Sequence, residues 1–166
     1  MMRVMIMGVS GAGKSLVGAG LSTRLGVRFV EGDDLHPSAN VEKMRSGIPL
    51  TDDDRWPWLD RVADVLSDDA PVVVTCSALK RIYRERIKQR ARGPVLVVHL
   101  SGGKEAIRER LALRKGHFMP PSLLDSQFAT LETPSSDEAF SVDALAPLDD
   151  IVETIAKEFE AKSPNA

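Results

Sequence analysis

Cysteine, net charge and long apolar runs are all scarce in this chain of 166 residues, and each scarcity excludes something. The single cysteine, Cys76, cannot form a disulfide within the chain and suits a reducing compartment. A formal net charge of −2 provides no overall attraction to nucleic acid or to an anionic membrane surface. Because no apolar run approaches membrane-spanning length and the N-terminus has no signal-peptide pattern, we expect a cytoplasmic protein without a membrane or nucleic-acid partner.

What the chain does contain is typical of one folded domain. Its hydrophobic content of 43% and its charged content of 28% are ordinary for a globular protein. A length of 166 residues is sufficient to bury a sizeable core. We therefore predict a single domain over residues 1–166.

A glycine-rich run near the N-terminus is the strongest functional signal in the sequence. The apolar residues 4–7 before it are typical of a buried strand, and residues 16–25 after it have helical spacing. Strand, glycine-rich turn and helix form the context that a phosphate-binding P-loop requires. The pattern G-x-x-x-x-G-K-[ST] is filled by Gly8, Val9, Ser10, Gly11, Ala12, Gly13, Lys14 and Ser15.

The residue types in this run explain how it would bind a nucleotide. Glycines allow unusual backbone dihedrals, so successive N–H groups can form a cradle for phosphate at a helix N-terminus. Lys14 would reach the β- and γ-phosphates, and the Ser15 hydroxyl would bind Mg²⁺. The alternative, an ordinary turn rich in glycine and serine, does not account for the strand and helix on either side.

Strands and helices alternate along the chain. Further strands are predicted at 27–31, 71–75, 95–100 and 140–142, and helices at about 14–25, 38–46, 53–67, 79–91, 104–114, 121–132 and 148–160. This alternation predicts an α/β fold in which helices cover both faces of a parallel sheet. Ligands of such sheets bind beyond the carboxyl ends of the strands, so the residues at those ends are the ones to inspect.

Acidic residues and a histidine follow the second predicted strand. Glu31, Asp33 and His36 could bind Mg²⁺ through water and accept a proton from a hydroxyl. The alternative is a turn in which Asp34 or Ser38 caps the next helix. We favour a functional role for Asp33 because of its place in the fold, whereas for His36 the two interpretations are balanced. No acid follows the third predicted strand, so Glu31 and Asp33 are the expected metal partners.

Cations near other strand ends could hold an anionic acceptor. Arg55 follows the acidic residues 52–54, which fit the start of a helix, and it lies beside two tryptophans. A planar guanidinium there suits a carboxylate or phosphate, although stacking on core aromatics is an equal alternative. Lys80 and Arg84 lie in the first turns of a helix rich in cations. The other cations of that helix are expected to form a solvated face, with a nucleic-acid patch as the alternative.

Arginines and a break in helical pattern predict a lid. Arg110 and Arg114 are four residues apart and share a helix face, and Gly116 with Pro120 and Pro121 interrupts the pattern after them. Arginines on a lid can stabilise the charge of a phosphoryl group in transfer. We therefore predict a lid over about 114–135, with a salt-bridged helix surface as the alternative.

Together these motifs resemble the bacterial-type gluconate kinases, or gluconokinases, a P-loop family related to shikimate kinase. The resemblance runs from the P-loop to about residue 150 and rests on segments 8–15, 32–37, 40–44, 47–55, 76–84, 114–118 and 127–134. It implies ATP-dependent phosphorylation of D-gluconate at its 6-hydroxyl, giving 6-phosphogluconate and ADP. It also implies a P-loop kinase fold with a five-stranded parallel sheet in the order 2-3-1-4-5 and a lid. Family members are often dimers, so a homodimer is a further expectation.

The resemblance also implies roles for particular residues, with a substrate-binding segment at about 33–60. Asp33 matches the acid near the acceptor hydroxyl, and Arg55 matches an arginine on the substrate carboxylate. Glu31 stands where related kinases usually have Asp. The expected catalytic residues are Lys14, Asp33 and Arg114. ATP is expected to bind residues 8–15 with Arg110 and Pro147, and Mg²⁺ to bind Ser15 and, through water, Glu31. The residues expected to bind the substrate are Asp33, His36, Arg55, Lys80, Arg84, His117 and Gln127.

Competing functions are less consistent with the sequence. A GTPase would need an N-K-x-D run to recognise guanine, and neither Asn40 nor Asn165, the two asparagines of the chain, begins one. A nucleotide-gated binding module would lack the acceptor-side groups, of which Asp33 and Arg55 are examples. Another small-molecule P-loop kinase, for shikimate or a nucleotide, is the nearest alternative.

Overall fold

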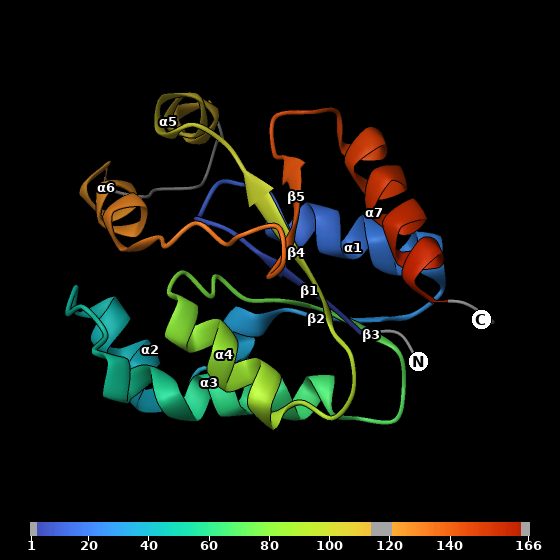
Figure 1. Cartoon of the computed structure of the whole chain (residues 1–166). Coiled ribbons are helices and arrows are strands. Elements are labelled where there is room, and N and C mark those ends of the chain that lie inside the picture. Colours follow the sequence, from blue (N-terminus) through green and yellow to red (C-terminus); the bar gives the residue numbers. More distant parts are fainter. Residues whose placement is uncertain (1–2, 114–120, 164–166) are drawn as a thin grey trace.

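A five-stranded parallel sheet forms the centre of the molecule in the computed structural model, which describes residues 3–113 and 121–163 (Figure 1). The strand order is β2-β3-β1-β4-β5, and each neighbouring pair is parallel. The predicted order 2-3-1-4-5 is therefore confirmed. The strands are β1 (Arg3–Met7), β2 (Arg28–Val30), β3 (Val72–Thr75), β4 (Leu96–Ser101) and β5 (Phe140–Asp143).

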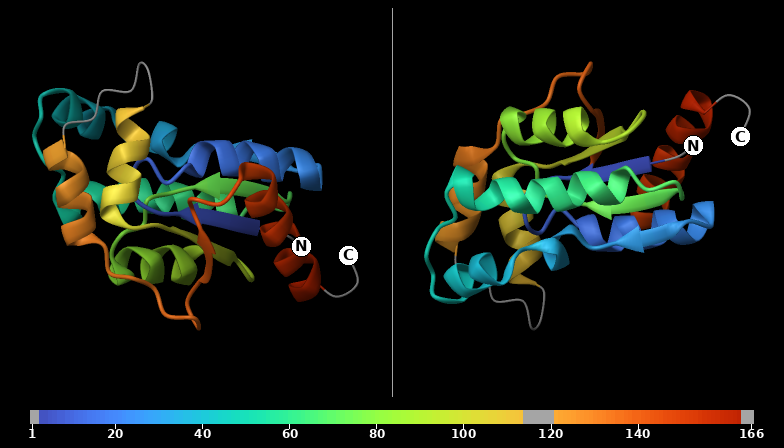
Figure 2. Two further views of the ribbon diagram at one scale, coloured as in Figure 1. Left: turned by 90° about the horizontal axis from the view of Figure 1, so that it is seen from above. Right: turned by 90° about the horizontal axis from the view of Figure 1, so that it is seen from below.

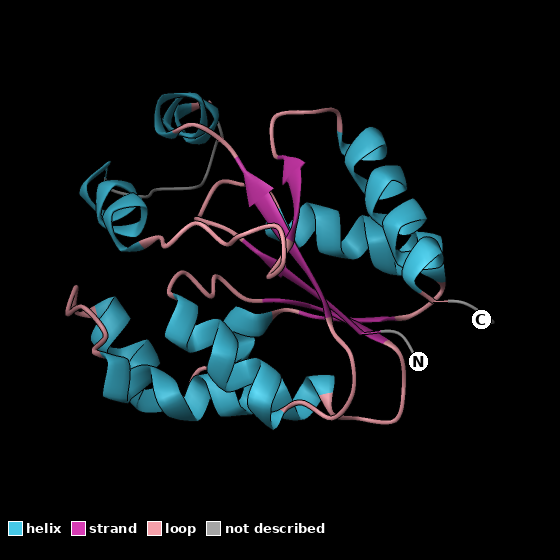
Figure 3. Ribbon diagram, viewed as in Figure 1, coloured by secondary structure: helices cyan, strands magenta, loops and turns pink. Residues whose placement is uncertain are grey.

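Helices cover both faces of this sheet. The helices α1 (Lys14–Leu25) and α7 (Leu148–Lys162) pack together on one face, and α3 (Asp52–Leu66) and α4 (Arg81–Arg90) pack together on the other (Figures 1 and 2). The helices α2 (Ser38–Arg45), α5 (Lys104–Ala112) and α6 (Pro121–Thr130) lie toward the end of the sheet opposite the two termini (Figure 3). That end holds the carboxyl ends of the strands, where ligands are expected.

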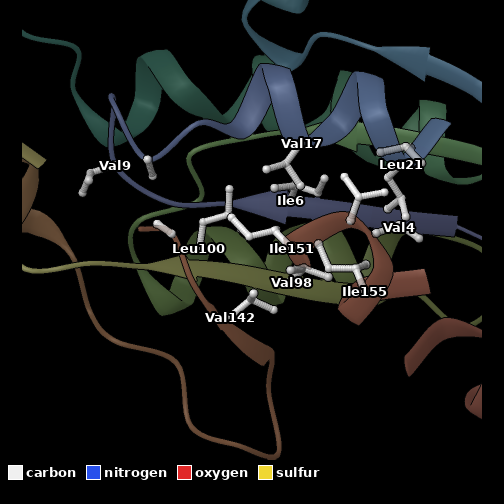
Figure 4. Close-up of a cluster of buried hydrophobic side chains, with 14 of the residues drawn as sticks. Val4, Ile6, Val9, Val17, Leu21, Val98, Leu100, Val142, Ile151 and Ile155 are labelled. Atoms are coloured by element: carbon white, nitrogen blue, oxygen red, sulfur yellow. The ribbon is translucent and has the colours of Figure 1, made fainter. Parts of the chain in front are cut away.

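Alternating side chains of the central strands divide the core into two clusters. Val4 and Ile6 of β1 face α1 and α7, where they meet Val98 and Leu100 of β4 (Figure 4). Met5 of β1 faces the opposite side, among side chains of α3 and α4. All residues of β1 and β3 are buried, as expected for central strands of a sheet covered on both faces.

The predicted elements agree with the observed ones to within a few residues, with one omission. A 3₁₀ turn, η1 (Gly32–Leu35), follows β2 where only a loop was expected. A single turn is too short to create a periodic apolar pattern, so periodicity could not reveal it. Its position matters because it carries Asp33. Within the described residues, no helix combines the length and apolarity needed to cross a membrane.

Candidate active site

The P-loop connects the carboxyl end of β1 to the first turn of α1. Gly13, the residue before α1, has φ of 93°, in the left-handed region that glycine adopts without strain. The Nζ of Lys14 donates hydrogen bonds to the carbonyl oxygens of Gly8, at 2.9 Å, and Val9, at 3.0 Å. The ammonium group is therefore held over the loop whose backbone would bind the phosphates.

Two acids that follow β2 affect the pKa of this lysine. Burial lowers the pKa of Lys14, and the negative charges of Asp33 and Glu31 oppose that shift. Asp33 is exposed and Glu31 is half-buried. The structure thus brings together the predicted donor-side lysine and the two predicted carboxylates, although they lie far apart in the sequence.

Glu31 is held in place by the neighbouring strand. The hydroxyl of Thr75 donates to Oε1 of Glu31 over 2.5 Å and accepts the backbone N–H of Gly32 at 3.0 Å. A Cβ on Gly32 would lie 1.7 Å from the carbonyl oxygen of Thr75, so only glycine allows this close approach. Thr75 was not predicted as a site residue, because its contact with Glu31 depends on the pairing of β2 with β3.

The oxygen-bearing groups at this end of the sheet suit Mg²⁺. Ser15 is exposed at the start of α1, and the hydroxyl of Thr75 engages one carboxylate oxygen of Glu31. Hydroxyl, carboxylate and water oxygens are the ligands that Mg²⁺ prefers. The described residues contain no group of three or more acids, histidines and cysteines placed to hold a metal. Phosphate oxygens and water would therefore have to complete the coordination.

Arg55 of α3 lies on the acceptor side with a free donor. Its guanidinium carbon lies 5.5 Å from the ring centroid of the buried Tyr83, which agrees with the predicted alternative of stacking on a core aromatic. Its terminal nitrogen makes a long contact of 3.5 Å with the carbonyl of Leu50. Its Nε is buried without a hydrogen-bond partner among the described residues. A buried guanidinium N–H without a partner is well suited to an anionic ligand.

Lys80 joins the same cluster through Asp52. Its Nζ lies 3.1 Å from a carboxylate oxygen of Asp52 and 5.6 Å from the ring centroid of Tyr83. The hydroxyl of Tyr83 donates to the same carboxylate oxygen, and this bond, followed by Lys80, lowers the pKa of Asp52. Lys80 is thus already paired with Asp52. The neighbouring residues Thr51 and Asp54 form the capping box at the start of α3.

His36 is held in place beside these residues by stacking. Its ring stacks on Trp58, with centroids 4.1 Å apart, and its Nδ1 lies 3.2 Å from the side-chain nitrogen of Asn40. Burial lowers the pKa of His36, Asp33 raises it, and Arg55 lowers it further. Asp33 and Arg55 therefore both lie close enough to His36 to affect its pKa, in opposite directions.

Arg84 does not reach the acceptor side as predicted. Its side chain is 1% exposed, and all five of its N–H donors are engaged. Two bonds go to the carboxylate of Glu138, and the other three go to the carbonyls of Ala78, Leu79 and Glu132. With no donor left for a substrate, Arg84 has a structural role instead of the predicted substrate contact.

Gln127 also differs from its predicted role. Its side chain contacts Ser10 of the P-loop, so it lies on the nucleotide side of the site. Leu124, three residues earlier on α6, is 1% exposed within the core cluster, so this part of the predicted lid is packed against the protein.

The two predicted nucleotide-side residues outside the P-loop, Arg110 and Pro147, are connected through the loop that follows β5. Arg110 of α5 donates to the carbonyl of Ala144 at 2.7 Å and faces Gly13, where a Cβ would lie 3.9 Å from its guanidinium. Ala144 belongs to the loop that ends at Pro147, the residue before α7. Two further predicted residues, Arg114 and His117, lie outside the described residues.

The exposed arginines of α4 are paired with acids. Arg81 pairs with Glu85 on the same helix, at 2.9 Å. Arg86 and Arg90 pair with Asp60 and Asp64 of α3, at 2.8 Å and 3.1 Å. These pairs favour the predicted solvated face over a patch that attracts phosphates.

The P-loop, with carboxylates and cations at the carboxyl ends of adjacent parallel strands, defines a P-loop kinase. An AAA domain model matches residues 4–134. The chain is 48% identical over 167 residues to the gluconokinase of Gluconobacter oxydans (strain 621H), covering 96% of this chain and 92% of that one. It therefore belongs to the gluconokinase family.

Solved structures agree with this assignment. A gluconokinase from Sinorhizobium meliloti 1021 has a TM-score of 0.89 at 46% identity, over 97% of this chain and 95% of that chain. A shikimate kinase from Aquifex aeolicus vf5 has a TM-score of 0.63 at 18% identity, over 99% and 100% of the two chains. At that identity the second likeness shows the shared fold alone.

Proposed function

We propose that the protein transfers the γ-phosphate of ATP to the 6-hydroxyl of D-gluconate, giving 6-phosphogluconate and ADP. The observation that carries this proposal is the position of Asp33 in η1, directly after β2 at the carboxyl end of the sheet, where the P-loop also follows β1. Its negative charge opposes the lowering of the pKa of Lys14 and of His36. A carboxylate there supports a role between the nucleotide and the acceptor. Membership of the gluconokinase family supports gluconate as the acceptor.

On the donor side, the P-loop amides and Lys14 bind the β- and γ-phosphates. Ser15 and, through water, Glu31 would hold Mg²⁺, which neutralises charge on the phosphates when it is bound. Arg110, which binds the carbonyl of Ala144, and the loop ending at Pro147 would contact the rest of the nucleotide. Catalysis of this kind depends mostly on positioning and on electrostatic stabilisation.

On the acceptor side, Asp33 orients the terminal hydroxyl of gluconate and accepts its proton. Arg55 binds the substrate carboxylate through its free Nε, and Lys80 binds other polar groups of the sugar acid. His36, whose pKa is lowered mainly by burial, contributes an imidazole that can hydrogen-bond a hydroxyl. This division of tasks explains why Arg55 and Lys80 gather at the ring of Tyr83.

Three further parts of the proposal rest on the sequence. Arg114 stabilises the transferring phosphoryl group and His117 contacts the substrate, both in the lid predicted over about 114–135, which excludes water during transfer although its α6 part is packed against the core. The protein acts in the cytoplasm, and, as the family resemblance implies, it forms a homodimer.

A coupled assay for ADP formation tests the proposal. We expect turnover with gluconate, and none above background with other sugar acids, shikimate or nucleoside monophosphates. The variant Lys14→Met should lower kcat by roughly two orders of magnitude or more, because it removes a charge that acts on the phosphates during transfer. Turnover with shikimate or AMP alone would contradict the assignment, as would a Lys14→Met variant with a near-normal rate.

A further inference from the structure

We propose that Gln127 is a positioning residue that fixes the first half of the P-loop for phosphoryl transfer. The proposal rests on the proposed kinase function and adds a residue whose task is performed through the loop. It assigns to Gln127 a contact with the nucleotide-binding loop in place of the substrate contact expected from the sequence.

The side chain of Gln127 makes two hydrogen bonds to a single P-loop residue. Its Oε1 accepts the backbone N–H of Ser10 at 2.7 Å, and its Nε2 donates to the hydroxyl of Ser10 at 3.0 Å. A primary amide that binds both a backbone group and a side chain restrains the orientation of the peptide as well as its position. Ser10 lies between Val9 and Gly11, inside the loop that would surround the phosphates.

Gln127 belongs to the buried face of α6. Leu124, Phe128 and Leu131 are spaced around it at helical intervals, and all three pack against the core cluster that contains β1 and α1. Gln127 is the polar member of this face. Its amide is therefore delivered to the P-loop by a helix that is anchored through apolar contacts.

A cavity lies beside this half of the loop. The cavity, of about 220 Å³, is lined by Val9 of the P-loop, by Phe128 and Leu131, and by residues 99–102 of β4 and its following turn. Val9 is itself buried in the core cluster, and Lys14 binds its carbonyl oxygen. Among the described residues, the two bonds of Gln127 are the hydrogen bonds that connect α6 to this half of the loop.

The other end of the same segment is attached to the acceptor half of the site. The N–H of Glu132 donates to the carbonyl of Leu79 at 2.8 Å, and the carboxylate of Glu132 accepts the N–H of Arg81 at 2.8 Å. Arg84 binds the carbonyl of Glu132 as well. The segment from Gln127 to Glu132 therefore joins the P-loop to the loop that carries Lys80.

Kinetics of the Gln127→Met variant test the proposal, because methionine keeps the length and apolar stem but cannot bond to Ser10. We expect kcat to fall about tenfold or more and the Kd for ADP to rise severalfold. A less rigid P-loop would position the phosphates less well, both when the nucleotide binds and during phosphoryl transfer. KM for gluconate should stay within about twofold, because no acceptor contact is removed. In a Ser10→Ala background, the same substitution should lower kcat by a smaller factor, because part of the contact is already absent.

Ser126→Ala is the matched control, because Ser126 is the exposed neighbour of Gln127 on α6. It should leave all these values unchanged, and the thermal midpoints of both variants should stay near that of the wild type. A tenfold rise in KM for gluconate with unchanged kcat would overturn the proposal in favour of a substrate contact. Unchanged kcat and Kd would overturn it outright. A wild type inactive on gluconate would refute the proposed function, and the Kd for ADP would still decide the role of Gln127.

Discussion

At the scale of single residues, binding of the phosphate acceptor is expected to depend on one unpaired hydrogen-bond donor, the Nε–H of Arg55. The Nε of Arg55 is buried without a partner among the described residues, while the neighbouring Lys80 is already paired with Asp52. Leaving a buried donor unsatisfied costs stability, and such a cost is typical of a group reserved for a ligand. We therefore expect the loss of Arg55 to weaken binding of the acceptor substrate more than the loss of Lys80.

We predict that Arg55→Ala raises KM for gluconate by about two orders of magnitude, as expected for the loss of a charged hydrogen bond to a carboxylate. KM for ATP should change much less, because Arg55 is assigned to the acceptor and makes its described contacts with Tyr83 and Leu50. Steady-state kinetics with each substrate varied in turn measure the two values. Arg92→Ala, which removes an exposed arginine from the connection between α4 and β4, serves as the control. Equal increases in both KM values would argue against a carboxylate contact.

At the scale of secondary-structure elements, Arg84 connects α4 to the segment before β5. Its side chain is fully enclosed, and its partner Glu138 lies 54 residues away along the chain. The same guanidinium binds the carbonyl of Ala78, which has a left-handed φ of 43°. One side chain thus stabilises both a long-range contact and a strained turn after β3.

We predict that Arg84→Met lowers the free energy of unfolding by about 3–5 kcal/mol, because it leaves a carboxylate and three carbonyls without their donor. Arg81→Met is the matched control, since Arg81 lies on the same helix in an exposed pair with Glu85. That control should change stability little, as is usual for surface ion pairs. Urea denaturation of both variants measures the difference, and similar midpoints for the two would contradict the structural role.

The sequence predicted the elements better than the contacts between them. Apolar spacing and glycine positions were enough for the strands, the helices and the P-loop, because these signals are local. The bonds of Gln127 to Ser10 and of Thr75 to Glu31 link residues 117 and 44 positions apart, so no local pattern encodes them. Arg84 was misassigned for the same reason: a cation near a strand end resembles a ligand until its buried partners are known.

At the scale of the whole molecule, Cys76 reports on the integrity of the fold. It is buried at the end of β3, and burial raises the pKa of its thiol to about 12. A thiol that is buried in this way and resists ionisation is expected to be inert and to serve in packing. Reagents that modify thiols can reach it only when this region opens.

We predict that wild-type stability declines, relative to Cys76→Ala, as the pH rises from 9.0 toward about 12. The thiol ionises in the unfolded chain near the ordinary pKa of 9.0 but resists ionisation in the folded state, so high pH favours unfolding. Below 9.0 the difference between the two proteins should be constant. Denaturation series at several pH values measure this difference, and a pH-independent difference throughout would contradict the burial effect.

The position of each half of the site in the sheet has a consequence for how such enzymes diversify. The P-loop follows β1, which pairs with β3 on one side and β4 on the other, whereas Glu31 and Asp33 follow β2, a three-residue strand at the edge that pairs with β3 alone. Changes around the edge strand disturb fewer neighbours than changes at the centre. Substitutions near β2 can therefore change which acceptor is phosphorylated in related proteins of this fold, while the binding of ATP after β1 is retained.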